Sequence, residues 1–300
     1  MSNLPDVFIY EVGPRDGLQN ESEFVSTASK IELINQLSAT GLQHIEVTSF
    51  VNPKRIPQLA DHLEVYQGID KNPHVNYSAL VPNTKGMEKA LQAEVQTIAI
   101  FTAASETFNF RNISCSIKES LERFKPLVEM AHENKIPIRA YVSCALGCPY
   151  EGHIDPKQVL DVALQLQALQ VTEISFGDTI GVGTPKQTQQ LLQCLLQAFT
   201  PEFICMHFHD TYGQAVANVY ASLEHDIRKF DSSLAGLGGC PYARGASGNL
   251  ATEDLLYLMH GMGLETGVDI YKIVQLGAKI CKLLQRPNSS KVGRALWVEP

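Results

Sequence analysis

The chain has 300 residues, which is enough for two ordinary domains or for one large barrel. Its hydrophobic content of 44% is typical of a globular protein in water. The formal net charge of −8 argues against a general nucleic-acid-binding surface, which would be basic, but permits a local cationic pocket. No apolar run is long enough to span a bilayer, and the N-terminus lacks a basic-then-apolar signal segment. We therefore expect a cytoplasmic protein that does not enter a membrane.

The cysteines also indicate a reducing compartment. Seven of them, an odd number, are scattered through the chain. Cys144 and Cys148 have C-x3-C spacing, which differs from the C-x2-C of zinc and redox sites, and we interpret them as two thiols around a loop.

Eight short runs rich in Val, Ile, Phe or Tyr are predicted strands, and most are apolar enough to be covered on both faces. They occupy residues 7–12, 42–48, 74–81, 95–101, 136–143, 171–176, 203–209 and 229–234.

Amphipathic patterns between these strands predict helices. One covers residues 28–40 and stops at Gly41, and Asp155-Pro156 and Thr184-Pro185 each mark a capped helix start. Eight uninterrupted β-then-α units predict an α/β protein with a (β/α)8 TIM barrel, formed by residues 1–300 as a single catalytic domain with a short C-terminal helical extension from about residue 265. A doubly wound open sheet is the alternative.

A barrel places its functional residues at the C-terminal ends of the strands. Arg15 and Asp16 follow the first predicted strand, where a carboxylate can bind a hard cation and a guanidinium offers a permanent charge. A turn with a surface salt bridge is the other interpretation of this pair. Alternation along residues 44–48 puts His44, Glu46 and Thr48 on one face, so that Glu46 points into the barrel toward Arg15.

Two further charged residues lie on a predicted strand or just after one. Asp178 follows the sixth strand, where it either takes part in the chemistry or caps a turn. Arg139, on the fifth strand, either binds a substrate carboxylate or pairs with a carboxylate of the barrel.

His207 and His209 share one face of the seventh strand, which is a common way to hold a metal ion. Two core histidines are the alternative. With Asp16 and the amide oxygen of Asn249, they give two oxygen and two nitrogen ligands and no thiolate. This set suits Mg or Mn, with Co or Zn as further candidates. Asn249 could also serve only as a helix N-cap.

The segment 236–249, after the eighth strand, is rich in glycine and is predicted to be a flexible loop. Cys240 on this loop is either an incidental thiol or a proton donor that covers the site. The loop has neither a dinucleotide-binding fingerprint nor a P-loop lysine.

Several of these motifs together resemble the 3-hydroxy-3-methylglutaryl-CoA lyase family over about residues 7–294. The resemblance rests on residues 11–21, 141–152, 177–185 and 236–249, and the Gly-Gly-Cys-Pro-Tyr-Ala run at 238–243 narrows it from the wider group of metal-dependent lyase and synthase barrels. It implies cleavage of 3-hydroxy-3-methylglutaryl-CoA to acetyl-CoA and acetoacetate, as in leucine degradation and ketone body formation. It also implies an acyl-CoA substrate and, by expectation, a homodimer.

The same resemblance implies roles for individual residues. The metal ligands would be Asp16, His207, His209 and Asn249. The catalytic residues would be Arg15, which stabilises the enolate oxygen, Glu46 and Asp178 in the charge network, Cys240 over the site, and either His207 or Asp178 as the base. Candidates for binding the substrate are Arg15, Arg139, Ser49 and Thr179.

The chain departs from animal members of the family in two places. Phe208 and Trp297 stand where animal members tend to have cysteines, which argues against a thiol switch at the C-terminus. With no transit segment expected, these features favour a bacterial, cytoplasmic member. A Claisen-type acyl-CoA synthase, a hydroxy-oxo-acid aldolase and a non-catalytic barrel are the alternatives.

Overall fold

The structure, a computed structural model, is a closed barrel of eight parallel strands, and it describes residues 5–239 and 248–298. The strands are β1 (Phe8–Glu11), β2 (His44–Ser49), β3 (Asn76–Leu80), β4 (Thr97–Ala103), β5 (Ile138–Ser143), β6 (Glu173–Asp178), β7 (Ile204–Phe208) and β8 (Lys229–Ser232). Each strand pairs with the next in sequence, and β1 also pairs with β8, with Tyr10 opposite Asp231. This closure confirms the predicted TIM barrel and excludes the open sheet.

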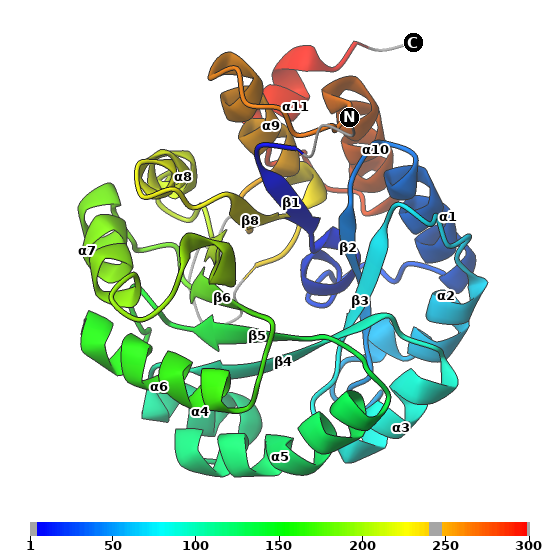
Figure 1. Cartoon of the computed structure of the whole chain (residues 1–300). Helices are drawn as coiled ribbons and strands as arrows, with labels where there is room; N and C mark the ends of the chain where they lie inside the picture. Colours follow the sequence, from blue (N-terminus) through cyan, green and yellow to red (C-terminus); the bar gives the residue numbers. More distant parts are fainter. Residues whose placement is uncertain (1–4, 240–247, 299–300) are drawn as a thin grey trace.

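Helices form a ring outside the strands (Figure 1). In chain order they are α1 (Thr27–Ser38), α2 (His62–Gly68), α3 (Thr84–Gln92), α4 (Glu106–Ile113), α5 (Ile117–Glu133), α6 (Pro156–Ala168), α7 (Pro185–Leu195), α8 (Ala215–Leu223), α9 (Thr252–Gly261), α10 (Ile270–Leu283) and α11 (Lys291–Leu296). The last two lie beyond the eighth β/α unit and form the C-terminal helical extension. In the described part of the chain, no helix combines the length and apolar character needed to cross a membrane.

The predicted helix starts at residues 156 and 185 are confirmed. Asp155 and Thr184 each form a capping box with a glutamine three residues later, and proline occupies the first helical position. The predicted end of the first helix is less accurate, because α1 stops at Ser38. Gly41 lies in the following turn with φ of +99°, where an added Cβ would be 2.0 Å from the carbonyl oxygen of Gly267.

The barrel has an apolar outer layer and a polar interior. Most buried apolar side chains lie in one cluster between strands and helices, whereas a much smaller cluster is formed by Leu80, Ala99 and Tyr141. The prediction that most strands are covered on both faces is confirmed, because β5, β6 and β7 are buried almost throughout, but their inner face is not apolar. Buried charges occupy it instead, and they are tolerated because they are paired.

Candidate active site

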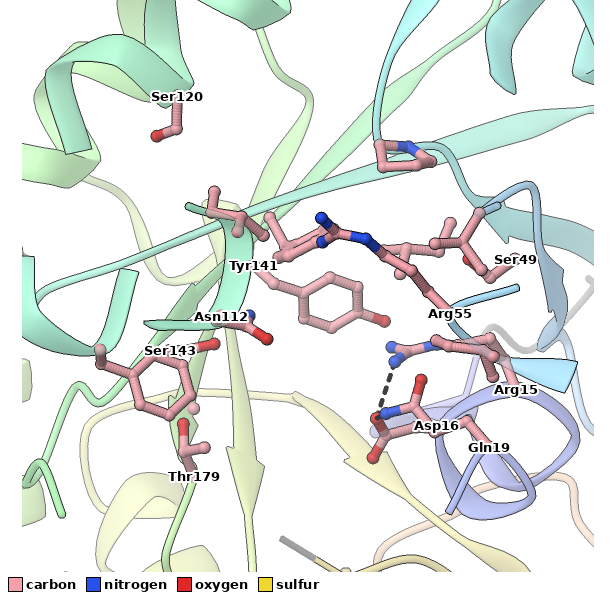
Figure 2. A pocket seen from close by; sticks show the side chains of 18 of the residues that line it. Arg15, Asp16, Gln19, Ser49, Arg55, Asn112, Ser120, Tyr141, Ser143 and Thr179 are labelled. Carbon is pink, nitrogen blue, oxygen red and sulfur yellow. Dashed lines mark hydrogen bonds and ion pairs between the residues drawn. The ribbon is translucent and has the colours of Figure 1, made fainter. Parts of the chain in front are cut away.

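A cavity of about 730 Å³ opens at the C-terminal ends of the strands. Its wall includes Arg15 and Asp16 after β1, Tyr141 on β5 and Thr179 after β6, which Figure 2 shows around one central space. His207 of β7 also lines it. Polar residues from four different strands thus meet at the face where TIM barrels carry their active sites.

The turn that carries Arg15 and Asp16 is a single turn of π-helix, Gly13–Gly17. Such turns are rare and occur often at functional sites. Its amides point back to the carbonyl of Val12, and the N–H of Gly13 donates to the Glu11 carboxylate at 2.8 Å. The tight turn holds two adjacent charged side chains at the cavity.

Three of the predicted metal ligands come together. Asp16, His207 and His209 each offer a ligand atom, and these atoms lie within 4.8 Å of one another. Asn249 joins them because its backbone bridges to His209 and its Nδ2 donates to Asp16 Oδ2 at 2.9 Å.

The remaining donor atoms fit a cation. The Oδ1 of Asn249 and the Nδ1 of His209 are buried and have no hydrogen-bond partner among the described residues. Buried polar atoms without a partner are rare, so both atoms point to an absent ligand. Burial and the neighbouring His207 lower the pKa of His209 to about 4, which keeps its ring neutral, as metal binding requires.

His207 is oriented by Asp231 on the neighbouring strand β8. Its Nδ1 lies 3.1 Å from Asp231 Oδ2, which leaves Nε2 for the cavity. Burial opposes the charged ring, but the hydrogen bond and charge of Asp231 outweigh it and raise the pKa of His207. Asp231 in turn accepts hydrogen bonds from Arg139 Nη2 at 2.6 Å and Ser175 Oγ at 2.7 Å.

Arg15 belongs to a buried charge network. Its Nη1 donates to Asp16 at 2.7 Å, its Nε pairs with Glu46, and the Tyr141 hydroxyl also donates to Glu46. Burial alone would lower the pKa of Arg15, but Glu46 and Asp16 reverse the effect and raise it. The predicted pairing of Arg15 with Glu46 is confirmed, and the guanidinium is a fixed, permanent cation beside the metal-binding group.

Strand β2 does not alternate as predicted. Its register with β3 shifts between Glu46 and Thr48, so a bulge follows Glu46. As a result Ser49, and not Thr48, lines the cavity. The Oγ of Ser49 is buried and has no hydrogen-bond partner in the part of the chain that the structure describes.

Arg139 does not line the cavity. Its guanidinium is buried and pairs with Glu173 through Nε at 2.6 Å and with Asp231 through Nη2 at 2.6 Å. The structure therefore contradicts its interpretation as a substrate ligand and favours pairing within the barrel, because both of its ionic contacts are to barrel carboxylates.

Asp178 is also absent from the described lining of the cavity. Its carboxylate accepts hydrogen bonds from the backbone N–H groups of Gly183 at 2.8 Å and Val182 at 3.1 Å. Burial raises its pKa to about 6 despite these bonds. Thr179, the next residue, does line the cavity, and its Oγ1 accepts from the Cys144 amide at 2.8 Å.

The glycine-rich loop is only partly described. Cys240 lies outside the described residues, so its predicted role stays a prediction. Gly239, just before it, lines the cavity, and its carbonyl accepts a hydrogen bond from Asn20 at 2.9 Å. The loop thus leaves the barrel beside the turn of Arg15 and Asp16.

Sequence reasoning missed Tyr141, Ser175 and Asp231. Each had a signal: Tyr141 and Asp231 lie inside predicted strands, and Ser175 is a small polar residue near the end of one. Alternation places Tyr141 on the same face as Arg139, so a polar inner face was predictable. Which of these groups would meet across the barrel was not.

Comparisons with known proteins show the family of the chain. The HMGL-like family model matches residues 6–280. A Pseudomonas aeruginosa protein named 3-hydroxy-3-isohexenylglutaryl-CoA/hydroxy-methylglutaryl-CoA lyase is 54% identical, over 98% of both chains. The cytoplasmic 3-hydroxy-3-methylglutaryl-CoA lyase of the mouse is 53% identical, over 98% of this chain and 86% of the relative.

Solved structures give the same picture. The hydroxymethylglutaryl-CoA lyase of Pseudomonas aeruginosa superposes with a TM-score of 0.95 at 53% identity, over 98% of both chains. An HMG-CoA lyase from Acinetobacter baumannii, in complex with coenzyme A and 3-methylmalate, gives a TM-score of 0.94 at 37% identity, over 100% of this chain and 99% of the other. By its sequence and fold, this chain belongs to the HMGL-like family.

Proposed function

We propose that this protein is a lyase that cleaves 3-hydroxy-3-methylglutaryl-CoA into acetyl-CoA and acetoacetate. The observation that carries the proposal is the convergence of Asp16, His207 and His209 with the orphaned amide oxygen of Asn249, beside the buried cation of Arg15. The family of the chain supports this reaction, and the geometry of these residues supports their assignment to it.

We assign Asp16, His207, His209 and Asn249 as ligands of a divalent cation. Mixed carboxylate, amide and imidazole donors without thiolate favour Mg or Mn, with Co or Zn as further candidates. A cation bound there supplies Lewis acidity toward oxygens of the substrate. Asp231 fixes the His207 ring for this role, as acidic partners do at many metal centres.

The cleavage is a retro-Claisen reaction. The tertiary hydroxyl of the substrate loses its proton, its C–O bond becomes the ketone of acetoacetate, and the C2–C3 bond breaks. The electron pair of that bond passes to the acetyl-CoA fragment as an enolate, whose oxygen Arg15 stabilises as a preorganised cation. Protonation of the enolate carbon completes acetyl-CoA, and we assign the covering and proton-donating role to Cys240.

Two residues are candidates for the base that takes the hydroxyl proton. His207 lines the cavity but is also a proposed metal ligand. Asp178 has a pKa of about 6, which suits a proton acceptor near neutral pH, but its carboxylate is held by backbone amides. An Asp178→Asn variant separates them: loss of turnover with unchanged metal affinity assigns the base to Asp178, and near-normal turnover assigns it to His207.

Small polar groups around the cavity are suited to holding the acyl group. Ser49 has a free buried hydroxyl, and Thr179 and the Tyr141 ring complete the wall on the β5 and β6 side. Arg15 provides the positive charge of the inner wall. We therefore assign Arg15, Ser49, Thr179 and Tyr141 as substrate ligands in place of Arg139. We also propose a cytoplasmic homodimer that acts in leucine degradation.

The decisive experiment follows acetoacetate formation from 3-hydroxy-3-methylglutaryl-CoA after EDTA treatment, with and without added Mg or Mn. We expect EDTA to abolish cleavage and the metal to restore it. Absence of cleavage with every metal would overturn the proposed substrate while leaving the barrel and the family intact.

A further inference from the structure

The cavity is cationic although the protein as a whole is acidic. Its wall includes Arg15, Arg55 and Arg123, and Asp16 is the sole carboxylate among the described residues that line it. The whole chain carries a formal charge of −8. Charges of one sign around a hollow of low polarisability focus the field and attract ligands of the opposite sign.

Arg55 is an uncommitted cation at the cavity mouth. It lies between β2 and α2, in a turn closed by hydrogen bonds from Arg55 N to Asn52 O at 2.8 Å and from Lys54 N to Asn52 Oδ1 at 3.0 Å. Figure 2 shows its guanidinium extended toward the cavity near Tyr141. Within residues 5–239 and 248–298 its exposed side chain has no ion pair, so the backbone is held while the charge is free for a ligand.

Arg123, on α5, contributes a second exposed guanidinium to the same cavity. The two acidic residues that precede it within one turn of its helix already have partners. The Glu119 carboxylate accepts from Ser116 N at 2.9 Å and Ser116 Oγ at 3.2 Å in the capping box, and Glu122 pairs with Lys125 at 2.7 Å. No ion pair of Arg123 is formed with any other residue that the structure covers.

Arg15 contrasts with these two cations. It is 6% exposed and is neutralised by Glu46 and Asp16 beside the metal-binding group. We therefore expect the acyl group of the substrate, where the reaction takes place, to bind beside Arg15. An anion that meets Arg55 and Arg123 must lie nearer to solvent, at the end of the ligand that is remote from the chemistry.

We infer that Arg55 and Arg123 bind the phosphate groups of the coenzyme A portion of the substrate. This inference rests on the proposed function and extends it from the acyl group to the rest of the ligand. Guanidinium groups suit phosphate because their planar donors pair with two oxygens at once. Asn52, Asn83 and Asn112 also line this cavity, and their neutral side chains do not repel an anionic ligand.

Calorimetric binding of free coenzyme A, dephospho-coenzyme A and pantetheine tests the inference without any turnover. We expect Arg55→Gln and Arg123→Gln each to raise the Kd for coenzyme A by about tenfold, the loss typical of one charge-assisted contact. Pantetheine has no phosphate, and its Kd should not change. Dephospho-coenzyme A identifies which arginine meets the 3′-phosphate.

Lys54→Gln and Lys118→Gln are the matched controls. Both remove one exposed positive charge close to the tested arginines, but neither lysine lines the cavity. If the arginine variants bind coenzyme A as tightly as these controls, the inference is wrong.

The KM values for pantetheine and coenzyme A thioesters show whether Arg55 binds the phosphate groups or the acyl carboxylate of the substrate. If both thioesters lose affinity equally in Arg55→Gln, the guanidinium binds the acyl carboxylate and the phosphate assignment is overturned. Normal coenzyme A binding by the unaltered protein, without cleavage, would refute the proposed function and leave this inference standing.

Discussion

Asp231 links the polar side chains on the inner face of the barrel. It contacts Arg139, Ser175 and His207, which come from three neighbouring strands, β5 to β7. Burial alone would raise its pKa, but Arg139 and His207 reverse the effect and hold that pKa well below the usual range. A permanently ionised carboxylate therefore sits behind the metal-binding histidine.

Asp231→Asn should weaken metal binding by roughly 10- to 100-fold, because the His207 ring loses the charge that orients it. Titration of the metal-free protein with Mn, followed by calorimetry, measures this. Cys205→Ala is the matched control, since the Cys205 thiol also contacts Asp231 and Arg139 but not His207. Equal metal affinity in both variants would contradict the orienting role.

Arg15→Gln should lower turnover by roughly 100-fold or more, if Arg15 acts like an oxyanion donor at the developing enolate. Metal affinity should change much less, because Arg15 is not a ligand. Steady-state kinetics at saturating metal gives the result, and a variant with near-normal turnover would defeat this assignment.

At the scale of elements, two buried carboxyl groups join the turns that frame the site. Glu11, at the end of β1, accepts from the N–H groups of Gly13 at 2.8 Å and Leu234 at 2.9 Å. Glu253, on α9, accepts from Ala235 N at 2.9 Å. Burial raises the pKa of Glu11 to about 7 and that of Glu253 to about 8. The π-helical turn of Asp16 and the short turn before the glycine-rich loop are thereby held in place.

These raised pKa values make stability depend on pH. The unfolded pKa of Glu253 is 4.5 and the folded value is about 8. Below 4.5 the group is protonated in both states and costs nothing. Between about 4.5 and 8 folding must take up a proton, and above 8 it must bury an ion, so the free energy of unfolding falls across this window, by an amount on the order of a few kcal/mol, and then levels off.

Glu253→Gln should therefore become more stable relative to the parent as pH rises from 5 to 9, because the amide keeps an acceptor for Ala235 and carries no charge. Urea unfolding at both pH values measures the difference. Glu129→Gln, an exposed site on α5, should show no such trend. A difference between parent and variant that is independent of pH would show that Glu253 does not titrate in this range.

At the scale of the whole molecule, the proposed metal site connects segments that are far apart in the sequence. Its ligands come from the turn after β1, from β7 and the residue that follows it, and from the segment between β8 and α9. A bound cation would therefore tie together three parts of the chain that are far apart in sequence.

Metal binding should stabilise the fold. At a concentration of 100 times its Kd, the cation adds about 2.7 kcal/mol to the free energy of unfolding. This corresponds to a rise in Tm of several degrees for a chain of this size, by extrapolation from somewhat smaller domains. Thermal unfolding with EDTA and with Mg or Mn tests it, and an unchanged Tm at saturating metal would contradict the site.

The sequence alone determined the eight strands, the helix starts at Pro156 and Pro185, and the presence of Asp16, His207 and His209 at strand ends. Periodicity, capping residues and the rule that sites lie at the C-terminal end of a barrel are all local or topological signals. Only the tertiary structure decided the partners of Arg139, the bulge after Glu46, the free oxygen of Asn249 and the position of Arg55. The physical reason is that these features depend on the stagger of strands around a closed barrel, which brings together residues from distant parts of the chain.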